Sequence, residues 1–309
     1  MKVTWMISLG LLVAVFVLSI PLAILILGRI GPVAPAIEKN DQAQVMQLDG
    51  GQIRYQDEGQ GPEATLMIHG FNHQMIAWES VWPKVQCGRK IRIDVPGYGE
   101  SIWPASSYSV PEQAKRIIQF MDAMGLKKVN LLGVSMGGSI SAWLASQYPD
   151  RVKGLVLLAP SGYPGSLQYY GAFGRLVGPG FFNQVASTLA DLGPYRWKFP
   201  NSRALHALTV TSSYGDAWVD ALKKIPQHAW VIWSHGDTGV PFRFALGVAK
   251  LIPSATLMGL DEKVGHDIPA NRSDLVAGLA CAVARGGDRG QVEAQVKKLF
   301  QGADRIEAL

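Results

Sequence analysis

The stretch 133–137, Gly-Val-Ser-Met-Gly, places a serine between two glycines where one apolar pattern gives way to another. Residues 128–132 before it predict a short strand, and residues 138–145 after it predict a helix. A serine on such a sharp strand-to-helix turn has strained backbone, and its hydroxyl projects above the sheet. The flanking glycines let the neighbouring chain pass close by. The stretch therefore predicts a turn that presents Ser135 as a nucleophile.

A second feature lies upstream, where residues 64–68 predict a buried strand that is followed by His69-Gly70-Phe71. A serine nucleophile needs N–H donors aimed at the oxygen that becomes negative during attack. We expect these donors to be the backbones of Met136, directly after the serine, and Phe71, in the loop after the upstream strand. His69 is interpreted as a residue that holds this loop by hydrogen bonds rather than as a base.

A carboxylate follows another predicted strand, 228–233, in the segment Ser-His-Gly-Asp-Thr-Gly that ends at Gly239. A carboxylate at a strand end can orient a histidine and stabilise its cation. Asp237 is also a typical turn-forming residue before Thr-Gly. Its place between the serine and a late histidine favours the role of catalytic acid. His235, in the same segment, is interpreted as a loop or wall residue.

The late histidine is His266, which follows the predicted strand 255–260 and precedes an amphipathic helix at about 273–284. A histidine on a loop after the last strand can reach the serine and act as general base. A solvated loop histidine is the alternative, but the chain holds only six histidines. Asp267 adjoins His266 and, as a sequence neighbour, is expected to point elsewhere.

These features in this order resemble the α/β-hydrolase superfamily, over about residues 45–285. Residues 94–101, Asp-Val-Pro-Gly-Tyr-Gly-Glu-Ser, are similar to the D-x-P-G-x-G-x-S loop of that family. The resemblance implies a mostly parallel sheet with helices on both faces, a helical cap, and a Ser135-Asp237-His266 triad. It also implies that Asp94 is structural. The serine argues against the branches with an aspartate nucleophile, the epoxide hydrolases and haloalkane dehalogenases.

The beginning of the chain predicts a membrane anchor, since residues 5–27 contain no charged side chain. A helix needs about 20 apolar residues to cross a bilayer, whereas a secretory signal has a shorter apolar core. We expect an uncleaved transmembrane helix within 1–30 and a Pro-rich linker over 31–44. A cleaved signal and a buried core helix are the alternatives. Flanking charges give a weak orientation bias, and we expect an exported catalytic domain.

With this anchor, the single His-Gly-Phe loop and the Gly-Val-Ser-Met-Gly-Gly elbow, the chain most resembles monoacylglycerol lipase-type members that carry a membrane anchor. In the family an insertion after the strand at 152–158 forms the cap, which here is expected at about 162–227. Its aromatic side chains either line an acyl pocket or pack the cap onto the core. The segment 286–309 is predicted to be a helical tail.

Charge and cysteine usage limit the partners and cofactors. The net charge of +5 comes from scattered Lys and Arg, without the aromatic-interleaved basic patch typical of nucleic-acid binding. Mild attraction to anionic lipid remains open. Cys87 and Cys281 form no C-x-x-C pair, so neither a zinc site nor a redox motif is expected. They are either two buried thiols or, in an exported domain, one disulfide.

The sequence therefore predicts a serine hydrolase of carboxylic esters, with lipid-like or other apolar acyl groups, that works through an acyl-enzyme without a metal or cofactor. Two alternatives stay open. One is a C–C bond hydrolase of a ring-fission product that uses the same machinery. The other is a non-catalytic binding protein, since a fold does not dictate its function. The exact acyl and alcohol groups and the oligomeric state are left open.

Overall fold

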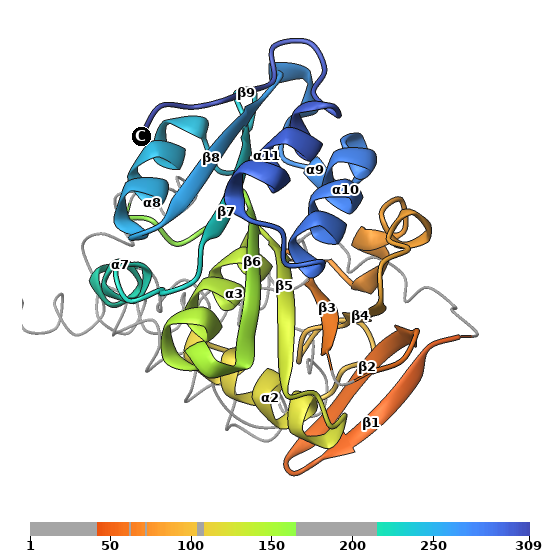
Figure 1. Ribbon diagram of the computed structural model, residues 1–309. Helices are drawn as coiled ribbons and strands as arrows, with labels where there is room; N and C mark the ends of the chain where they lie inside the picture. Colours follow the sequence, from red (N-terminus) through yellow and green to blue (C-terminus); the bar gives the residue numbers. More distant parts are fainter. Residues whose placement is uncertain (1–41, 62, 72, 104–107, 165–214) are drawn as a thin grey trace, which may run out of the picture.

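The computed structural model describes residues 42–61, 63–71, 73–103, 108–164 and 215–309 (Figure 1). The expected anchor at 1–30, most of the linker at 31–44 and much of the expected cap at 162–227 lie outside these ranges. Among the residues that are described, no helix combines the length and the apolar character needed to cross a membrane.

The centre of the domain is a mostly parallel sheet, as the resemblance implied. The described strands are ordered β1-β2-β4-β3-β5-β6-β7-β8-β9. Neighbours from β4 to β8 pair in parallel, while β1, β2 and β9 pair antiparallel at the two edges. The strands are β1 Gln44–Leu48, β2 Gly51–Glu58, β3 Glu63–Ile68, β4 Arg89–Ile93, β5 Lys128–Val134, β6 Val152–Leu158, β7 Ala229–Ser234, β8 Ala255–Leu260 and β9 Arg305–Ile306.

Helices cover both faces of this sheet (Figure 1). One layer contains α2, α3, α7 and α8, and the other contains α9, α10 and α11, with α3 and α10 packed on the central strands from opposite sides. The described α-helices are α2 Val110–Ala123, α3 Met136–Gln147, α7 Asp216–Leu222, α8 Ala245–Leu251, α9 Ile268–Asn271, α10 Ser273–Ala284 and α11 Arg289–Lys297. The short 3-10 helices are η1 Met75–Trp78, η2 Trp82–Lys84, η3 Pro149–Arg151, η4 Phe242–Phe244 and η5 Glu262–Val264.

The central strands are largely apolar and buried because helices cover them on both sides. Every residue of β7 and β8 is buried. Parallel strands bring their carboxyl ends to one edge of the sheet, which is where ligands of open α/β sheets bind. The segments that the sequence singles out at 69–71, 94–101, 133–137, 235–239 and 261–267 all follow strands, so they gather at this edge.

The C-terminal segment returns to the sheet. It contains α11, and it then runs along β8 as the antiparallel strand β9, with Ile306 opposite Met258. Residues 286–309, predicted as a helical tail, thus comprise one helix and one edge strand. Two carboxylates of this segment, Glu307 and Asp304, contact the loops that follow β7 and β8.

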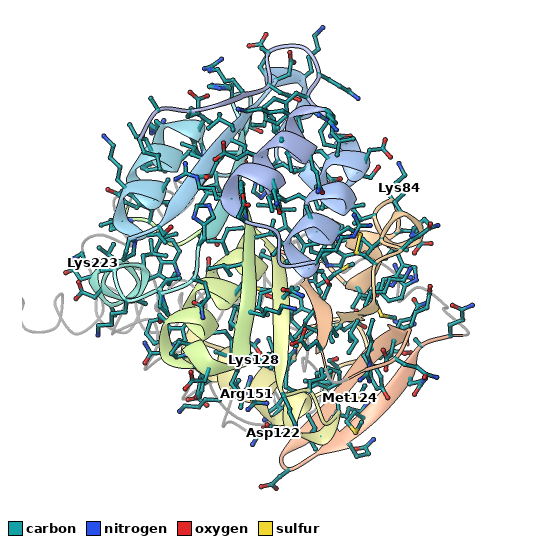
Figure 2. All side chains as sticks on the ribbon, viewed as in Figure 1. Lys84, Asp122, Met124, Lys128, Arg151 and Lys223 are labelled. Carbon is teal, nitrogen blue, oxygen red and sulfur yellow. A yellow bond between two sulfur atoms is a disulfide. The ribbon has the colours of Figure 1, made fainter. Side chains whose placement is uncertain are left out.

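The two cysteines form a disulfide between Cys87, just before β4, and Cys281 in α10. This bond joins segments 194 residues apart in the sequence. Structural disulfides persist mainly in oxidising compartments. Among the basic side chains labelled in Figure 2, Lys84 and Lys223 lie on opposite sides of the view, and Lys128 and Arg151 lie together at its foot.

Candidate active site

Ser135 lies on the turn between β5 and α3, as the sequence pattern predicts. Its backbone has φ 53° and ψ −116°, a left-handed conformation that is strained for any residue with a side chain. The turn leaves no room for a side chain at Gly137, where a Cβ would collide with the carbonyl of Ile68 in β3. Tight packing against the neighbouring strand thus holds the serine in this strained geometry.

The loop after β3 lies beside this turn. A Cβ placed on Gly70 would stand 3.3 Å from the Cβ of Ser135, so the backbone that leads to Phe71 passes next to the serine. Met136 is the first residue of α3, and its N–H therefore has no acceptor within the helix. Tyr98 packs edge-on against Phe71 and its hydroxyl lies 3.4 Å from the Met136 sulfur. The two predicted oxyanion donors thus come from segments that meet around Ser135 and Tyr98.

Asp237 and His266 meet across the loops that follow β7 and β8. The Nδ1 of His266 lies 2.7 Å from Oδ2 of Asp237, and the Asp237 carboxylate is fully shielded from solvent. The other oxygen, Oδ1, accepts hydrogen bonds from the N–H groups of Gly239 and Val240, each at 2.8 Å. Asp237 is therefore both the turn former and the histidine partner, the two interpretations that its sequence allowed.

The imidazole of His266 keeps one nitrogen for chemistry. Its Nδ1 is engaged by Asp237, so Nε2 is the nitrogen that can exchange a proton. The side chain is 34% exposed, which leaves it accessible from the edge of the sheet. A Cβ on Gly239 would stand 2.9 Å from Cγ of the ring, so the backbone of the loop that follows β7 packs directly against the imidazole.

His69 is oriented differently. It is completely buried, its Nδ1 lies 2.7 Å from the Gly70 carbonyl, and its Nε2 accepts the N–H of Val95 at 2.9 Å. Burial lowers the pKa of His69 to about 3, so the ring is neutral at physiological pH. With both ring nitrogens engaged by backbone, His69 ties the loop after β3 to the loop after β4, the role that the sequence indicated.

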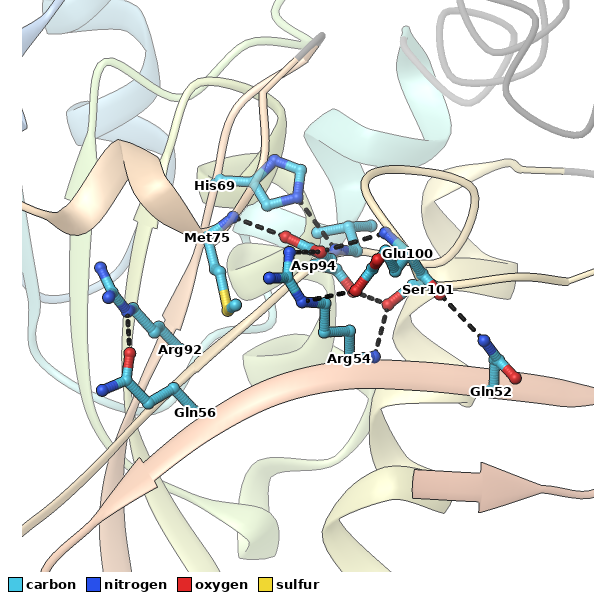
Figure 3. Close-up of polar contacts among 10 residues, drawn as sticks. Gln52, Arg54, Gln56, His69, Met75, Arg92, Asp94, Glu100 and Ser101 are labelled. Carbon is cyan, nitrogen blue, oxygen red and sulfur yellow. Dashed lines mark hydrogen bonds and ion pairs between the residues drawn. The ribbon is translucent and has the colours of Figure 1, made fainter. Parts of the chain in front are cut away.

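Asp94 is the centre of a second buried network (Figure 3). Its Oδ1 accepts the N–H of Met75 at 2.7 Å, and Oδ2 accepts the N–H of Glu100 at 3.2 Å and faces Arg54 at 3.4 Å. Burial raises the pKa of Asp94, and the hydrogen bonds and Arg54 oppose that rise. The hydroxyl of Ser101 donates to the Asp94 carbonyl at 2.6 Å. These bonds hold loop backbone, which is a structural role.

His235 and Asp267 are close in sequence to Asp237 and His266, but they do not bond to this pair. His235 lies 2.8 Å from Oε1 of Glu307 in the C-terminal segment, and its ring packs 3.8 Å from that of Phe242. Asp267 is exposed and directly precedes α9. Both positions agree with the interpretation of these residues as loop residues.

Two residues near the pair carried no signal in the sequence. Ser234 ends β7, and Asp304 precedes β9; both are buried through their side chains and hydrogen bond to the loop that carries His266. Serine and aspartate are common in loops, and their partners here are backbone atoms that lie 27 to 43 residues away. No local pattern reports such contacts.

Within the described part of the chain, no group of three or more His, Cys, Asp or Glu side chains is arranged to hold a metal ion. What the site presents instead is a strained serine on the elbow, two backbone donor candidates beside it, and a carboxylate–imidazole pair. All of them stand at the carboxyl edge of one parallel sheet.

Comparison with known proteins places the chain in a family. The family model described as alpha/beta hydrolase fold matches residues 65–239, more than half of the chain. The chain therefore belongs to the α/β-hydrolase family.

Two curated relatives show the range of similarity. A poly(3-hydroxyalkanoate) depolymerase of Ectopseudomonas oleovorans is 29% identical over 259 residues, 76% of this chain and 89% of the relative. The monoacylglycerol lipase abhd6-A of Xenopus laevis is 37% identical over 109 residues, 33% of this chain and 32% of the relative. The chain spans only 32% to 40% of the length of some other curated relatives.

Among solved structures, a bacterial membrane phospholipase A superimposes with a TM-score of 0.62. It is 22% identical, and the superposition covers 93% of this chain and all of the other. At this identity the likeness concerns the fold.

Proposed function

We propose that this chain is a serine hydrolase that cleaves carboxylic esters with apolar acyl groups. The observation that carries the proposal is the 2.7 Å contact between His266 and the buried Asp237 carboxylate, at the same sheet edge as the strained Ser135. A nucleophile, a base and a residue that orients the base are the parts that acyl transfer requires.

In the proposed first step, Nε2 of His266 takes the proton of Ser135 while the serine oxygen attacks the ester carbonyl. Asp237 stabilises the imidazolium through Nδ1 and holds its orientation. The backbone N–H groups of Phe71 and Met136 stabilise the oxyanion, a contribution of roughly 3 kcal/mol per donor in comparable sites. The carbon–oxygen bond to the alcohol then breaks, and the alcohol leaves with the proton from His266.

In the second step, a water molecule gives a proton to His266 and its oxygen attacks the acyl-enzyme. The bond to Ser135 breaks, the acid leaves, and the proton returns to the serine oxygen. This cycle uses no redox change and regenerates every group, so the residues of the chain are sufficient for it.

An apolar acyl group is supported by two observations. Phe71 is 37% exposed beside the serine and offers an aromatic surface to a substrate. One relative is named a monoacylglycerol lipase, which favours a lipid-like ester. We therefore expect activity to rise with acyl length from acetate to medium chains.

A panel of nitrophenyl esters of graded acyl length, assayed with wild type and Ser135→Ala, tests this proposal. We expect Ser135→Ala to fold normally and to lose activity by about a millionfold, as in well-studied triads. A fluorophosphonate probe should label wild type at Ser135 and leave the variant unlabelled. Turnover of a ring-fission diketone without ester turnover would show a C–C bond hydrolase instead. Labelling of neither protein, without turnover, would show a binding protein.

We further propose that residues 1–30 anchor the chain in a membrane, with the hydrolase domain on the oxidising side. The charge-free run at 5–27 supports the anchor, and the Cys87–Cys281 disulfide supports the compartment. The full-length chain should resist alkaline carbonate extraction, and its two thiols should react with maleimide only after reduction. A mature N-terminus beyond residue 30 would show a cleaved signal, and thiols that react before reduction would contradict the compartment.

A further inference from the structure

Ser234 occupies an unusual position between the loops of the two proposed catalytic residues. It is the last residue of β7, it is completely buried, and it stands opposite Leu260, the last residue of β8. The acid loop begins directly after Ser234, and the base loop begins directly after Leu260. The Ser234 side chain therefore lies at the root of both loops.

The hydroxyl of Ser234 makes three hydrogen bonds. It donates to the carbonyl of Asp261 at 2.9 Å, and it accepts the N–H of Gly236 at 3.2 Å and the N–H of Gly265 at 3.0 Å. A hydroxyl has one hydrogen to donate and two lone pairs. The hydrogen and both lone pairs are used, so this one oxygen bonds to both loops.

The partners of this oxygen are the immediate neighbours of the proposed catalytic pair. Gly236 precedes Asp237, and Gly265 precedes His266. Fixing the N–H of both preceding residues fixes the points from which the two side chains extend. The hydroxyl thus has the geometry to set the spacing between the Asp237 carboxylate and the His266 ring.

Other contacts hold the base loop near its ends, and the side chain of Asn271 donates to the carbonyl of Val264 within it at 2.8 Å. Asp304 accepts the N–H of Asp261 at 2.9 Å and pairs with Arg272, and the Asp304 and Arg272 side chains are both buried. These contacts hold the residues where the loop starts and finishes. The bond from Gly265 to Ser234 acts in the middle of the loop, next to His266.

We propose that Ser234 is a positioning residue that keeps the Asp237 carboxylate and the His266 ring within hydrogen-bonding distance of each other. This inference rests on the proposed function, because it assigns Ser234 an effect only through that pair. Ser234 does not contact the substrate in this proposal. Loss of its hydroxyl would free both loop N–H groups and let the carboxylate and the ring drift apart.

The first measurement is the kinetics of Ser234→Ala on the best nitrophenyl ester. We expect kcat to fall by about tenfold to a hundredfold, the size of effect that a small misplacement of catalytic groups produces. KM should stay within about twofold, because no substrate contact is removed. Ser234→Thr keeps the hydroxyl and should recover most of kcat. If Ser234→Ala does not fold, Ser234→Cys is used in its place. Its thiol occupies a similar position but is only a weak hydrogen-bond donor and acceptor.

Ser101→Ala is the matched control. Ser101 is also completely buried, and its hydroxyl also joins two segments, by accepting the N–H of Arg54 at 2.8 Å and donating to the Asp94 carbonyl. Its hydroxyl bonds to Arg54 and Asp94 and not to the loops of Asp237 and His266 (Figure 3). Ser101→Ala should lower the melting temperature as Ser234→Ala does, and kcat should stay near that of wild type.

A double-mutant cycle separates positioning from general support. If Ser234 acts through the pair, adding Ser234→Ala to Asp237→Asn should lower kcat by less than about threefold more, because residues that act as a unit are non-additive. A purely structural role would multiply the two losses. Multiplying losses, or a wild-type kcat for folded Ser234→Ala, would overturn the inference.

Labelling of Ser135 by the fluorophosphonate keeps the two proposals distinguishable. If wild type is labelled and turns over esters but Ser234→Ala matches it, the proposed function stands and the role of Ser234 is refuted. If wild type is neither labelled nor active, the proposed function fails, and the role of Ser234 fails with it.

Discussion

Two histidine–aspartate clusters stand at the same edge of the sheet, and their side chains bond to different kinds of partner. His69 and Asp94 lie on the loops after β3 and β4, and each is bonded to backbone N–H or carbonyl groups. His266 and Asp237 lie on the loops after β8 and β7, and they bond to each other. Residue type and location at a strand end therefore do not separate a structural cluster from the one that we propose to be catalytic.

Solvent access and the partners of each ring nitrogen do separate them. His69 is completely buried with both nitrogens engaged, so it has no site for a transferred proton. His266 is one-third exposed and has a carboxylate on one nitrogen only. The His69 cluster should therefore control stability, and the His266 cluster should control rate.

The largest contrast is expected between the two histidines. His266→Gln should lower kcat by about a millionfold, because the proposed base is removed while binding remains. His69→Gln should lower the free energy of unfolding with a far smaller loss of kcat, since its ring supports loop backbone. Ester kinetics and urea unfolding of both variants measure the contrast. Similar losses of kcat in the two folded variants would show that the clusters are not distinct in function.

The two carboxylates give the next largest difference. Asp237→Asn should lower kcat by about ten-thousandfold, because an amide favours the wrong tautomer of the histidine. Asp94→Asn should instead cost about 1–3 kcal/mol of unfolding free energy, since it places an NH₂ group against donors that now bond to a carboxylate. Ester kinetics and urea unfolding of both variants measure this difference. A severe loss of kcat in Asp94→Asn, with Asp237→Asn near wild type, would reverse the assignment of the catalytic acid.

The pH dependence of stability should report His69. Its folded pKa of about 3 lies below the ordinary value of 6.5, so between these values the unfolded chain holds a proton that the folded chain lacks. This group therefore lowers stability as the pH falls from about 6.5 towards 3, by up to about 1.4 kcal/mol per pH unit. Above 6.5 the effect is absent.

Urea unfolding of wild type and His69→Gln between pH 7 and pH 4.5 tests this effect. The variant cannot take up the proton, so the difference in stability between the two proteins should shrink as the pH falls. A difference that stays constant over this range would mean that His69 titrates normally and is not locked in the neutral form.

The smallest contrast is expected from two glycines. Gly239→Ala places a Cβ 2.9 Å from Cγ of His266, and it should lower kcat by about tenfold to a hundredfold by displacing the ring. Gly99→Ala, at φ +54° and against the Asp94 carboxylate, should cost about 1–3 kcal/mol of stability instead. Kinetics and melting of both variants measure these effects. Unchanged kcat in Gly239→Ala would show that the ring tolerates displacement.

The elements that position the site could largely be predicted from the sequence. The strand expected at 255–260 is β8, the helix expected at about 273–284 is α10, and the strand and helix around Ser135 are β5 and α3. Apolar runs, periodicity and glycine-flanked turns are local signals, so they are present in the sequence itself. The turn-forming role of Asp237 does not exclude the proposed catalytic one, because one carboxylate oxygen holds the turn and the other lies against His266.

The sequence alone thus determined the succession of strands and turns along the chain and the residue types at each strand end. It also identified the turn that carries Ser135. The tertiary structure decided which of the two histidines faces solvent, that Cys87 and Cys281 are bonded, that the end of the chain adds β9 to the sheet, and that Ser234 connects the acid and base loops. Each of these depends on contacts between residues distant in the chain. Their partners are set by how strands and helices pack, which no local pattern encodes.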